Sequence, residues 1–259
     1  MKEIKIIITD WDGYPLQRKK NVGGDIVDCG IENSIKNMSE MKCDRVLKVH
    51  LVINSSANKW KYKLFPSKRG ELTSKEQYYL LKEKYPIIEK ISFRNNVGMD
   101  IGAYDLGLKE LMKSNYHGDV VFMNSSVAGP SKNHWLTTFQ TIFNSRDCTG
   151  LVGVSLNSHN TNLKPPEFKP HVQSFFLYSN TEVLYRVFSD GLPGAKVNDD
   201  KKRLIAEGEI GISTAILEAG YSISSSIFPT FNYKAGEDWT APTGDIRFSK
   251  EYGHLANKI

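Results

Sequence analysis

The chain has 259 residues, of which 40% are hydrophobic and 24% charged, and its formal net charge of +5 is the difference between 34 basic and 29 acidic residues. This composition is that of an ordinary globular protein with one substantial core, so we expect a single domain. The small basic excess suits an anionic small ligand or an anionic membrane surface. Nucleic-acid binding is not expected, because only Lys59–Lys63 approaches the dense basic stripe with aromatic residues that it requires.

The cysteines indicate a reducing compartment, and the amino-terminal sequence does not resemble a secretion signal. Cys29, Cys43 and Cys148 are odd in number and widely spaced, which predicts isolated thiols. After Glu3 the chain enters an apolar run too short for a signal sequence. No stretch approaches the roughly 18 apolar residues of a membrane span. We therefore expect a cytoplasmic protein with at most peripheral membrane contact.

Short β-branched runs alternate with longer amphipathic stretches, which predicts crossover units and a mainly parallel sheet. The expected strands are Ile4–Thr9, Lys48–Ile53, Ile88–Phe93, Val120–Met123, Leu151–Ser155 and Ser174–Tyr178. The expected helices are Ile31–Met41, Ser74–Lys84, Met99–Lys113, Trp135–Phe143, Thr181–Phe188 and Glu209–Ala219, the last followed by a C-cap glycine, Gly220. Loops are expected at Asn54–Thr73, Asn157–Pro170 and Gly191–Lys202.

The first candidate motif is the end of the first strand, where Thr9 is followed by Asp10 and Asp12. Two aspartates one residue apart resemble the opening motif of haloacid-dehalogenase phosphatases, with the first as nucleophile and the second as acid/base. Such an enzyme also needs a later acidic pair after a strand to hold Mg²⁺, and the adjacent pair Asp199 and Asp200 does not follow one. The alternative is that Thr9, Asp10 and Asp12 bind a nucleotide at the strand tip. A capping or turn role also stays open.

The second candidate follows the strand Ile88–Phe93, where Arg94, Asn96, Gly98 and Asp100 open a helix. Gly98 lacks a Cβ where a backbone approaches a pyrophosphate, and a helix N-terminus supplies free N–H groups. Arg94 offers a bidentate phosphate contact. Simple packing of the glycine turn is the alternative.

The order of four sequence blocks carries a family resemblance. The blocks are RNNVGMDIGAYDLGL, VVFMNSSVAGP, HVQSFFLYS and EIGISTAILEAGY, between Arg94 and Tyr221. Together they resemble the rhamnan-synthesis F family of polysaccharide enzymes. The resemblance implies an α/β fold of the GT-A kind (nucleotide-diphospho-sugar transferase), with helices flanking the sheet. It also implies transfer of a sugar, often rhamnose, from a nucleotide-sugar donor to a glycan or lipid-linked glycan acceptor. In that fold 1–123 is the nucleotide-binding half, and 124–259 the acceptor-binding half with the C-terminal tail.

Many relatives with this fold carry an Asp-x-Asp motif for a divalent metal after the strand that ends here at Met123. This chain has Asn124, Ser125 and Ser126 there. Neutral oxygens are poorer ligands than carboxylates for Mg²⁺ or Mn²⁺, which favours metal independence, with basic side chains neutralising the diphosphate. A metal, if one is used, would be held by Asp100 or His254. Asn124 and Ser126 are expected to orient the donor.

The last block supplies the candidate base. Glu209 lies eleven residues before Gly220, where the resemblance places the carboxylate that deprotonates the acceptor hydroxyl in inverting transfer. Its expected position at a helix start favours the ionised form. Glu207 is a nearby rival, and a purely capping role stays open. The third block and a late loop place His171, Gln173 and Trp239 on the acceptor side. A sugar- or nucleotide-binding module without catalysis remains the other alternative.

Overall fold

The computed structural model describes residues 2–22, 24–43, 45–55, 75–146, 148–198, 200–243, 246, 251–255 and 258–259. Three expectations fall on residues outside these ranges. They are the loop over most of 54–73, including Lys59–Lys63, the first residue of the expected helix Ser74–Lys84, and Asp199 of the acidic pair.

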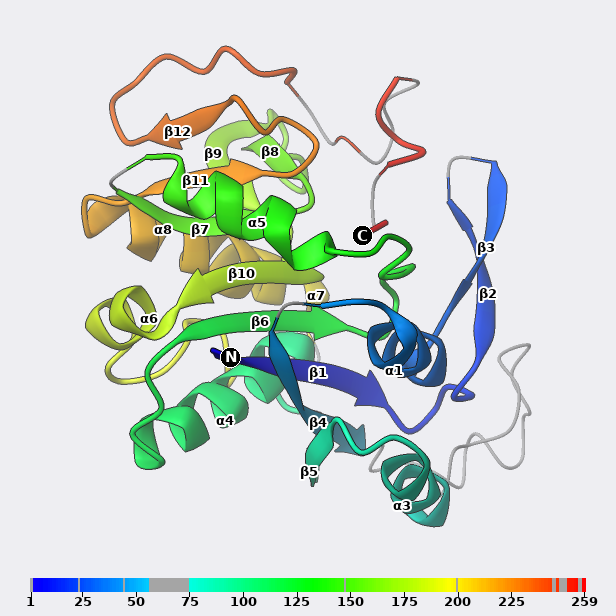
Figure 1. Ribbon diagram of the computed structural model, residues 1–259. Coiled ribbons are helices and arrows are strands. Elements are labelled where there is room, and N and C mark those ends of the chain that lie inside the picture. The colour runs from blue at the N-terminus through cyan, green and yellow to red at the C-terminus, as the bar shows by residue number, and fades with distance from the viewer. Residues whose placement is uncertain are drawn as a thin grey trace.

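One eight-stranded sheet runs through the molecule in the order β12-β11-β7-β10-β6-β1-β4-β5 (Figure 1). Its strands are β1 (Glu3–Trp11), β4 (Val46–Ser55), β5 (Ile88–Asn95), β6 (Asp119–Asn124), β7 (Thr149–Gly153), β10 (Phe176–Asn180), β11 (Ser222–Ser225) and β12 (Asn232–Lys234). Every strand expected from the sequence is present, with ends displaced by a few residues.

The sheet combines parallel strands with two antiparallel ones, β10 in its interior and β12 at its edge. The strands β5, β4, β1 and β6 are parallel to one another. β10 runs antiparallel to both of its neighbours, β6 and β7. The expected mainly parallel α/β sheet is therefore confirmed, with β10 and the edge strand β12 running opposite to the other strands.

Helices flank the sheet on both sides (Figure 1). They are α1 (Ile31–Glu40), α3 (Lys75–Lys84), α4 (Met99–Lys113), α5 (Trp135–Asn144), α6 (Thr181–Val187), α7 (Lys201–Leu204), the π-helical η1 (Ile205–Ile210) and α8 (Gly211–Glu218). The last three follow one another without a break, so the expected helix at Glu209–Ala219 begins eight residues earlier, at Lys201. Gly220 follows α8 with φ +86°, as expected for a C-cap glycine.

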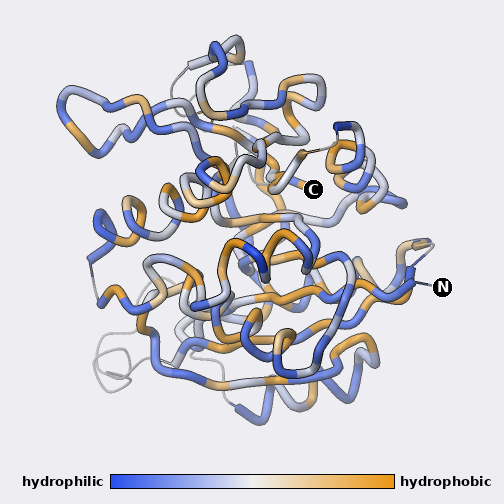
Figure 2. The backbone as a smooth tube through the Cα atoms, turned by 90° about the vertical axis from the view of Figure 1, so that its left-hand side faces the viewer, coloured by the Kyte–Doolittle hydropathy of each residue, from blue (hydrophilic) through white to orange (hydrophobic). Residues whose placement is uncertain are grey.

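The core follows from the near-continuous apolar sequence of the central strands. Ile6, Ile7 and Ile8 of β1 are fully buried although successive side chains point to opposite faces. Strands covered by helices on both faces lose the polar alternation of a half-exposed sheet. Figure 2 accordingly shows the hydrophobic residues concentrated along the inner strands and the hydrophilic ones towards the outer loops.

Two hairpins outside the main sheet were not expected. One is β2 (Arg18–Val22) with β3 (Asp25–Cys29), and the other is β8 (Leu156–Asn160) with β9 (Glu167–Val172). The second corrects the expected loop at Asn157–Pro170, whose two ends are strands. Both hairpins are polar, so neither shows the apolar alternation by which strands are recognised in a sequence.

The order in which the chain adds strands to the sheet reverses between β1 and β6, although these two strands are parallel. From β1 the chain proceeds through α1 to β4 and through α3 to β5, and then returns through α4 to β6 on the other side of β1. Crossovers of this kind are right-handed, so α1 and α3 lie on one face and α4 on the other. Ligands of open α/β sheets bind in the crevice outside the carboxyl ends of the strands at such a reversal.

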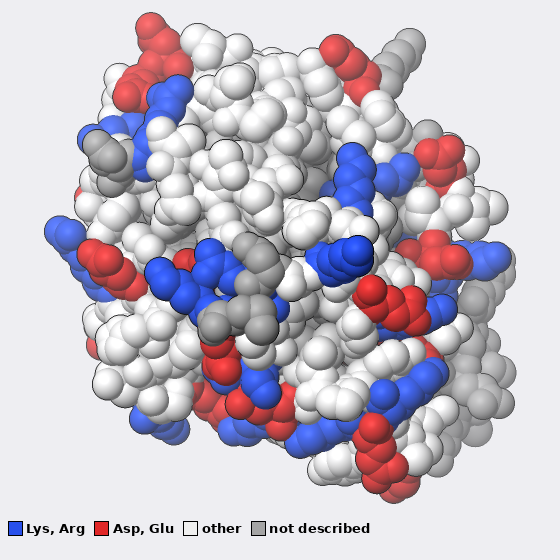
Figure 3. Space-filling view, viewed as in Figure 1, with Lys and Arg blue, Asp and Glu red and all other residues white. Residues whose placement is uncertain are grey.

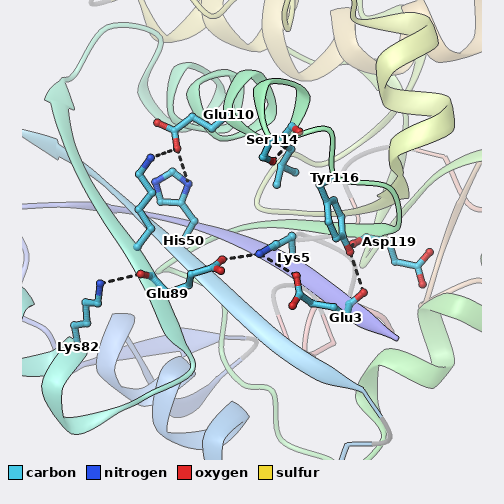
Figure 4. Close-up of polar contacts among 11 residues, drawn as sticks. Glu3, Lys5, His50, Lys82, Glu89, Glu110, Ser114, Tyr116 and Asp119 are labelled. Atoms are coloured by element: carbon cyan, nitrogen blue, oxygen red, sulfur yellow. Dashed lines mark hydrogen bonds and ion pairs between the residues drawn. The ribbon is translucent and has the colours of Figure 1, made fainter. Parts of the chain in front are cut away.

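Paired charges occupy the face of the sheet beside α4 (Figure 4). Lys5 Nζ lies 2.9 Å from a carboxylate oxygen of Glu3 and 2.6 Å from one of Glu89, and His50 Nδ1 lies 3.7 Å from Glu110. Burial lowers the pKa of His50 to about 4, although the Glu110 charge acts in the opposite direction. The charged side chains in the surrounding groove of about 490 Å³ are therefore largely paired with one another.

The described surface carries both signs of charge. On the face shown in Figure 3, lysine and arginine side chains are interspersed with aspartate and glutamate. A single-sign stripe, the usual footprint of a nucleic-acid site, does not cross the described part of this face. None of the helices in the described ranges is both long and apolar enough to cross a bilayer.

Candidate active site

A cleft of about 290 Å³ lies at the point where the strand order reverses, beside the end of β6 and the start of α4. Its walls bring together five residues that the sequence singled out: Asp100, Asn124, Ser126, Gln173 and Glu209. These residues come from α4, the end of β6 and the loop after it, the segment before β10, and η1. The three later sequence blocks and the start of the first therefore meet in one hollow.

Glu209 is held in this cleft by the segment that precedes β10. Its Oε2 accepts hydrogen bonds from the backbone N–H of Ser174 at 2.7 Å and from Ser174 Oγ at 2.8 Å. Its Oε1 lies 3.8 Å from Nε2 of His171, a buried side chain whose Nδ1 is 2.6 Å from the Lys169 carbonyl oxygen. That carbonyl can only accept, so Nδ1 carries a proton. One carboxylate oxygen of Glu209 is thus fixed by Ser174 and the other faces the His171 ring.

The expected helix start at Glu209 is wrong. Glu209 is the fifth residue of η1, inside a helical segment that begins at Lys201 and is capped by the side chain of Asp200. Glu209 therefore does not benefit from the dipole of a first helical turn, whose effect fades within that turn. The two hydrogen bonds from Ser174 instead hold the carboxylate in position.

Asp100 and Asn124 face each other across the floor of the cleft. Asn124 Nδ2 donates a 2.7 Å hydrogen bond to Asp100 Oδ2, while Asn124 Oδ1 accepts hydrogen bonds from the backbone N–H and the hydroxyl of Ser126. Burial raises the pKa of Asp100, and the nearby Glu209 charge raises it further, whereas the Asn124 hydrogen bond lowers it. This network fixes the orientation of the Asn124 side chain.

Asp10 is buried behind the wall of the cleft. Its Oδ2 accepts a 2.8 Å hydrogen bond from Tyr78, and its Oδ1 accepts one from the hydroxyl of Ser125, the residue between Asn124 and Ser126. Burial raises the pKa of Asp10 to about 6, while its hydrogen bonds and the Arg18 charge act in the opposite direction. Asp10 is thus linked to the cleft through Ser125.

Thr9 and Asp12 are also buried at the end of β1 and approach Asn54 at the end of β4. Thr9 Oγ1 accepts a 3.0 Å hydrogen bond from the Asn54 side chain, and the Asp12 backbone N–H donates to the Asn54 carbonyl at 3.1 Å. These two predicted donor-binding residues lie at the switch point of the sheet but behind the lining of the cleft.

Arg94 and the glycines after it shape the backbone at the start of α4. Arg94 Nη1 donates to Asn54 Oδ1 at 2.6 Å and Nη2 donates to the Val97 carbonyl, while Asn96 lies half-buried in the same turn. Gly98 has φ +69°, and a Cβ there would come within 2.2 Å of the Ala195 carbonyl oxygen. The close approach expected of Gly98 is therefore made by the loop at Ala195, and the guanidinium of Arg94 is engaged by backbone carbonyls and Asn54.

Three basic side chains near the cleft were not identified from the sequence. Lys20 of β2 and Lys201 of α7 line it, and Arg18 of β2 donates a 2.8 Å hydrogen bond from Nη2 to Ser125 Oγ. In the sequence they lie in the short basic clusters RKK at 18–20 and KKR at 201–203. Such clusters usually form solvated faces, and only the fold shows that two of them meet at one place.

Two other predicted residues lie away from the cleft. Trp239 packs at 4.9 Å between ring centroids from Phe231 and at 5.4 Å from Tyr233, near β12. His254 is exposed in the turn at 251–255. Gln173, by contrast, lines the cleft, and its Oε1 accepts a 2.6 Å hydrogen bond from Ser155.

The donor set of the cleft is a poor match for a tightly held divalent metal. Asp100 and Glu209 are its two carboxylates, and each already accepts hydrogen bonds from Asn124 or Ser174. Within the described ranges no group of three or more His, Cys, Asp or Glu side chains has the arrangement of a metal site. Oxygen-rich carboxylate sites are the usual hosts of Mg²⁺ and related ions.

Comparison with protein-family models identifies the chain. The model described as rhamnan synthesis protein F matches residues 67–245. The chain belongs to this family. The match includes all four sequence blocks that meet at the cleft and extends beyond them on both sides. A comparison with curated proteins finds no match.

Solved structures show which fold this member of the rhamnan synthesis protein F family adopts. A mannosyltransferase from Pyrobaculum calidifontis, solved in complex with GDP-mannose and Mn²⁺, is 14% identical with a TM-score of 0.52, over 86% of this chain. The chain spans about half of that protein, 54% of its length. Mouse xyloside xylosyltransferase 1 is 9% identical with a TM-score of 0.36, over 71% of this chain and 69% of its own. The GT-A-like fold expected from the sequence is confirmed.

Proposed function

We propose that this protein is a glycosyltransferase that moves a sugar from a nucleotide-diphosphate donor to a hydroxyl of a glycan or lipid-linked glycan. The observation that carries the proposal is the single cleft in which Glu209, Asp100, Asn124 and Ser126 meet at the switch point of the sheet. Membership of the rhamnan synthesis protein F family supports the assignment and makes rhamnose the first sugar to test. The fold shared with a mannosyltransferase solved with GDP-mannose supports a nucleotide-sugar donor.

The proposed chemistry is single displacement with inversion. The acceptor hydroxyl oxygen attacks the anomeric carbon while the bond from that carbon to the diphosphate oxygen breaks. Glu209 accepts the hydroxyl proton, and the nucleoside diphosphate leaves with the bonding electrons. Ser174 holds Oε2 of Glu209 in place, which leaves Oε1 as the oxygen that takes the proton. A base fixed in this way loses little freedom when the acceptor binds.

The donor is assigned to the floor of the cleft. Asn124, Ser126 and Asp100 already form one hydrogen-bonded group there, which preorganises their polar atoms for the ribose or the sugar. Asp10, through Ser125, keeps the loop after β6 in position. Gln173, which lines the cleft, is proposed to contact the acceptor, and the His171 ring lies beside Oε1 of Glu209. Because the donor set suits a metal poorly, we propose that transfer does not depend on one.

The test is the Glu209→Gln variant, which keeps the size of the side chain and removes the base. With a competent donor and acceptor, its kcat should fall by about 10² to 10⁴, the usual contribution of a general base. Glu207→Gln is the matched control, since Glu207 is exposed and pairs with Arg203 on the solvent side of the same helix. Near-normal turnover of Glu209→Gln would show that Glu209 is not the base.

Two other functions make different predictions. A phosphatase that uses Asp10 would hydrolyse p-nitrophenyl phosphate in Mg²⁺ and lose that activity in Asp10→Asn. Both oxygens of Asp10 already accept hydrogen bonds from Ser125 and Tyr78, which disfavours attack by this carboxylate. A binding module would bind nucleoside diphosphates but release none from a nucleotide sugar in the presence of acceptor.

A further inference from the structure

Two lysines from distant parts of the chain enter the candidate cleft. Lys20 comes from the β2–β3 hairpin and Lys201 from the first turn of α7, and both line the hollow that holds Asp100 and Glu209. Lys20 Nζ lies 3.4 Å from the carbonyl oxygen of Ser126, at the mouth of the loop that follows β6. The hairpin therefore places an ammonium group directly over the predicted donor-binding loop.

Arg18 adds a third positive charge beside the same loop. Its guanidinium stacks over the Tyr14 ring at 4.1 Å and donates through Nη2 to Ser125 Oγ. The Nη1 group is buried and has no hydrogen-bond partner among the described residues. A buried N–H without an acceptor is unfavourable, so the Arg18 guanidinium keeps unused hydrogen-bonding capacity beside this loop.

The strand geometry of β2 places Lys19 on the opposite face from Arg18 and Lys20. Successive side chains of a strand point to opposite faces, so Arg18 and Lys20 share one face and Lys19 lies on the other. Lys19 is exposed, in register with Asp28 of β3. On α7, Lys202 likewise follows Lys201 but does not line the cleft. Each cleft lysine thus has an adjacent lysine of equal charge that faces elsewhere.

A diphosphate entering this cleft would meet the negative charges of Asp100 and Glu209. Guanidinium and ammonium groups bind phosphate oxygens through charge-assisted hydrogen bonds and offset that repulsion. We propose that Arg18, Lys20 and Lys201 form a cationic clamp that binds the diphosphate of the donor in place of a divalent metal. This inference rests on the proposed glycosyltransferase function and deepens it by naming the groups that bind the leaving group.

The test compares two double variants with the same net charge. The affinities of UDP, GDP, dTDP and their monophosphates are measured by titration calorimetry, first in EDTA and then with Mn²⁺. In Lys20→Gln/Lys201→Gln, the diphosphate that binds wild type best should bind roughly 10² times more weakly in EDTA, since each lost charge-assisted bond is worth about tenfold. Lys19→Gln/Lys202→Gln should stay within about twofold of wild type, because neither side chain faces the cleft.

The monophosphates show whether the effect belongs to the diphosphate. The ratio of diphosphate to monophosphate affinity should shrink in Lys20→Gln/Lys201→Gln and stay unchanged in the control. An Arg18→Gln variant, checked for a wild-type melting curve, should shrink it as well. The clamp is overturned if the cleft variants bind diphosphate as wild type does, or if wild type binds diphosphate only with Mn²⁺.

These outcomes are separable from failure of the proposed function. If wild type transfers sugar and Lys20→Gln/Lys201→Gln leaves the KM for the donor unchanged, the clamp is wrong and the glycosyltransferase assignment stands. If wild type binds no nucleotide and transfers no sugar with any donor of the panel, the proposed function and the clamp both fail.

Discussion

Asp10 stands out among the single residues because its carboxyl is buried at the end of the central strand. Burial raises its pKa to about 6 from an ordinary value of 3.8, although the hydrogen bonds from Ser125 and Tyr78 and the charge of Arg18 favour the ionised form. Near neutral pH the folded protein therefore holds a carboxylate that would be better solvated in the unfolded chain.

A pH dependence of stability follows from this shift. Between about pH 4 and pH 6 the folded state keeps the Asp10 proton and the unfolded state releases it, so the free energy of unfolding falls as pH rises. The contribution of Asp10 is on the order of 2 to 3 kcal/mol, present below pH 4 and lost above pH 6. Urea unfolding of wild type and Asp10→Asn from pH 4 to pH 7.5 measures it by difference. A difference that does not vary with pH would contradict the assignment.

The residues of the cleft differ in how far the sequence alone identifies them. Glu209, Asp100 and Asn124 lie in blocks whose order resembles a family, and the structure places them together. Lys20 and Lys201 lie in ordinary basic clusters, 181 residues apart, and nothing local distinguishes them from solvated lysines. Arg94 was expected to bind phosphate, yet its position shows that an arginine next to a glycine turn also serves to hold that turn.

At the scale of elements, the start of α4 depends on two glycines that fit against the loop before α7. Gly98 donates its N–H to the Val197 carbonyl at 2.8 Å, and a Cβ on Gly102 would come within 3.0 Å of the Ala195 carbonyl oxygen. The loop at Ala195 and the first turn of α4 are thus packed backbone to backbone, which sets the position of Asp100 in the cleft.

The Gly98→Ala substitution should therefore destabilise the protein by two mechanisms. The left-handed backbone at φ +69° costs an alanine about 1 to 2 kcal/mol, and the contact with Ala195 adds displacement of the loop. Gly220→Ala is the matched control, because Gly220 has φ +86° with open space around its Cβ position. Chemical unfolding should show a loss of about 1 kcal/mol for the control and clearly more for Gly98→Ala. Equal losses would mean that the loop contact is unimportant.

Regular apolar elements were predictable and polar ones were not. The buried strands and amphipathic helices have periodic sequences, and their positions were correct to within a few residues, except for the last helix, which begins eight residues before the expected Glu209. The β2–β3 hairpin has the polar sequence RKKNV in one strand, and most side chains of the other strand are exposed. The hairpin is therefore held mainly by backbone pairing between its two strands, which a sequence pattern does not reveal. The π-helical turn in η1 is also invisible to sequence periodicity, because it changes the number of residues per turn for one turn only.

At the scale of the whole molecule, the sheet is continuous across the expected boundary between a nucleotide-binding half at 1–123 and an acceptor-binding half at 124–259. β10 of the second half pairs with β6 of the first, from Phe176 opposite Met123 to Asn180 opposite Asp119. The fold class followed from the alternation of strands and helices, but this pairing did not, since no local signal specifies the direction or partner of a strand.

Shortening the chain tests how far the two halves depend on each other. A chain that ends after Val172 lacks β10 and leaves β6 unpaired on one side, so it should associate into large particles measurable by light scattering. A chain that ends after Phe231 loses the three-residue edge strand β12 and the residues beyond it, and should remain monodisperse. A monodisperse Val172 product would show that β6 needs no cover.

The place of β10 also bears on synthesis by the ribosome. Val120, Val121, Phe122 and Met123 of β6 are entirely apolar and buried, yet the strand that covers their free hydrogen-bonding side emerges about fifty residues later. During that interval the nascent chain exposes an unpaired strand edge that is prone to aggregation, the kind of surface that chaperones shield. Slow translation between β6 and β10 should therefore lower the yield of native protein more than slow translation after β10.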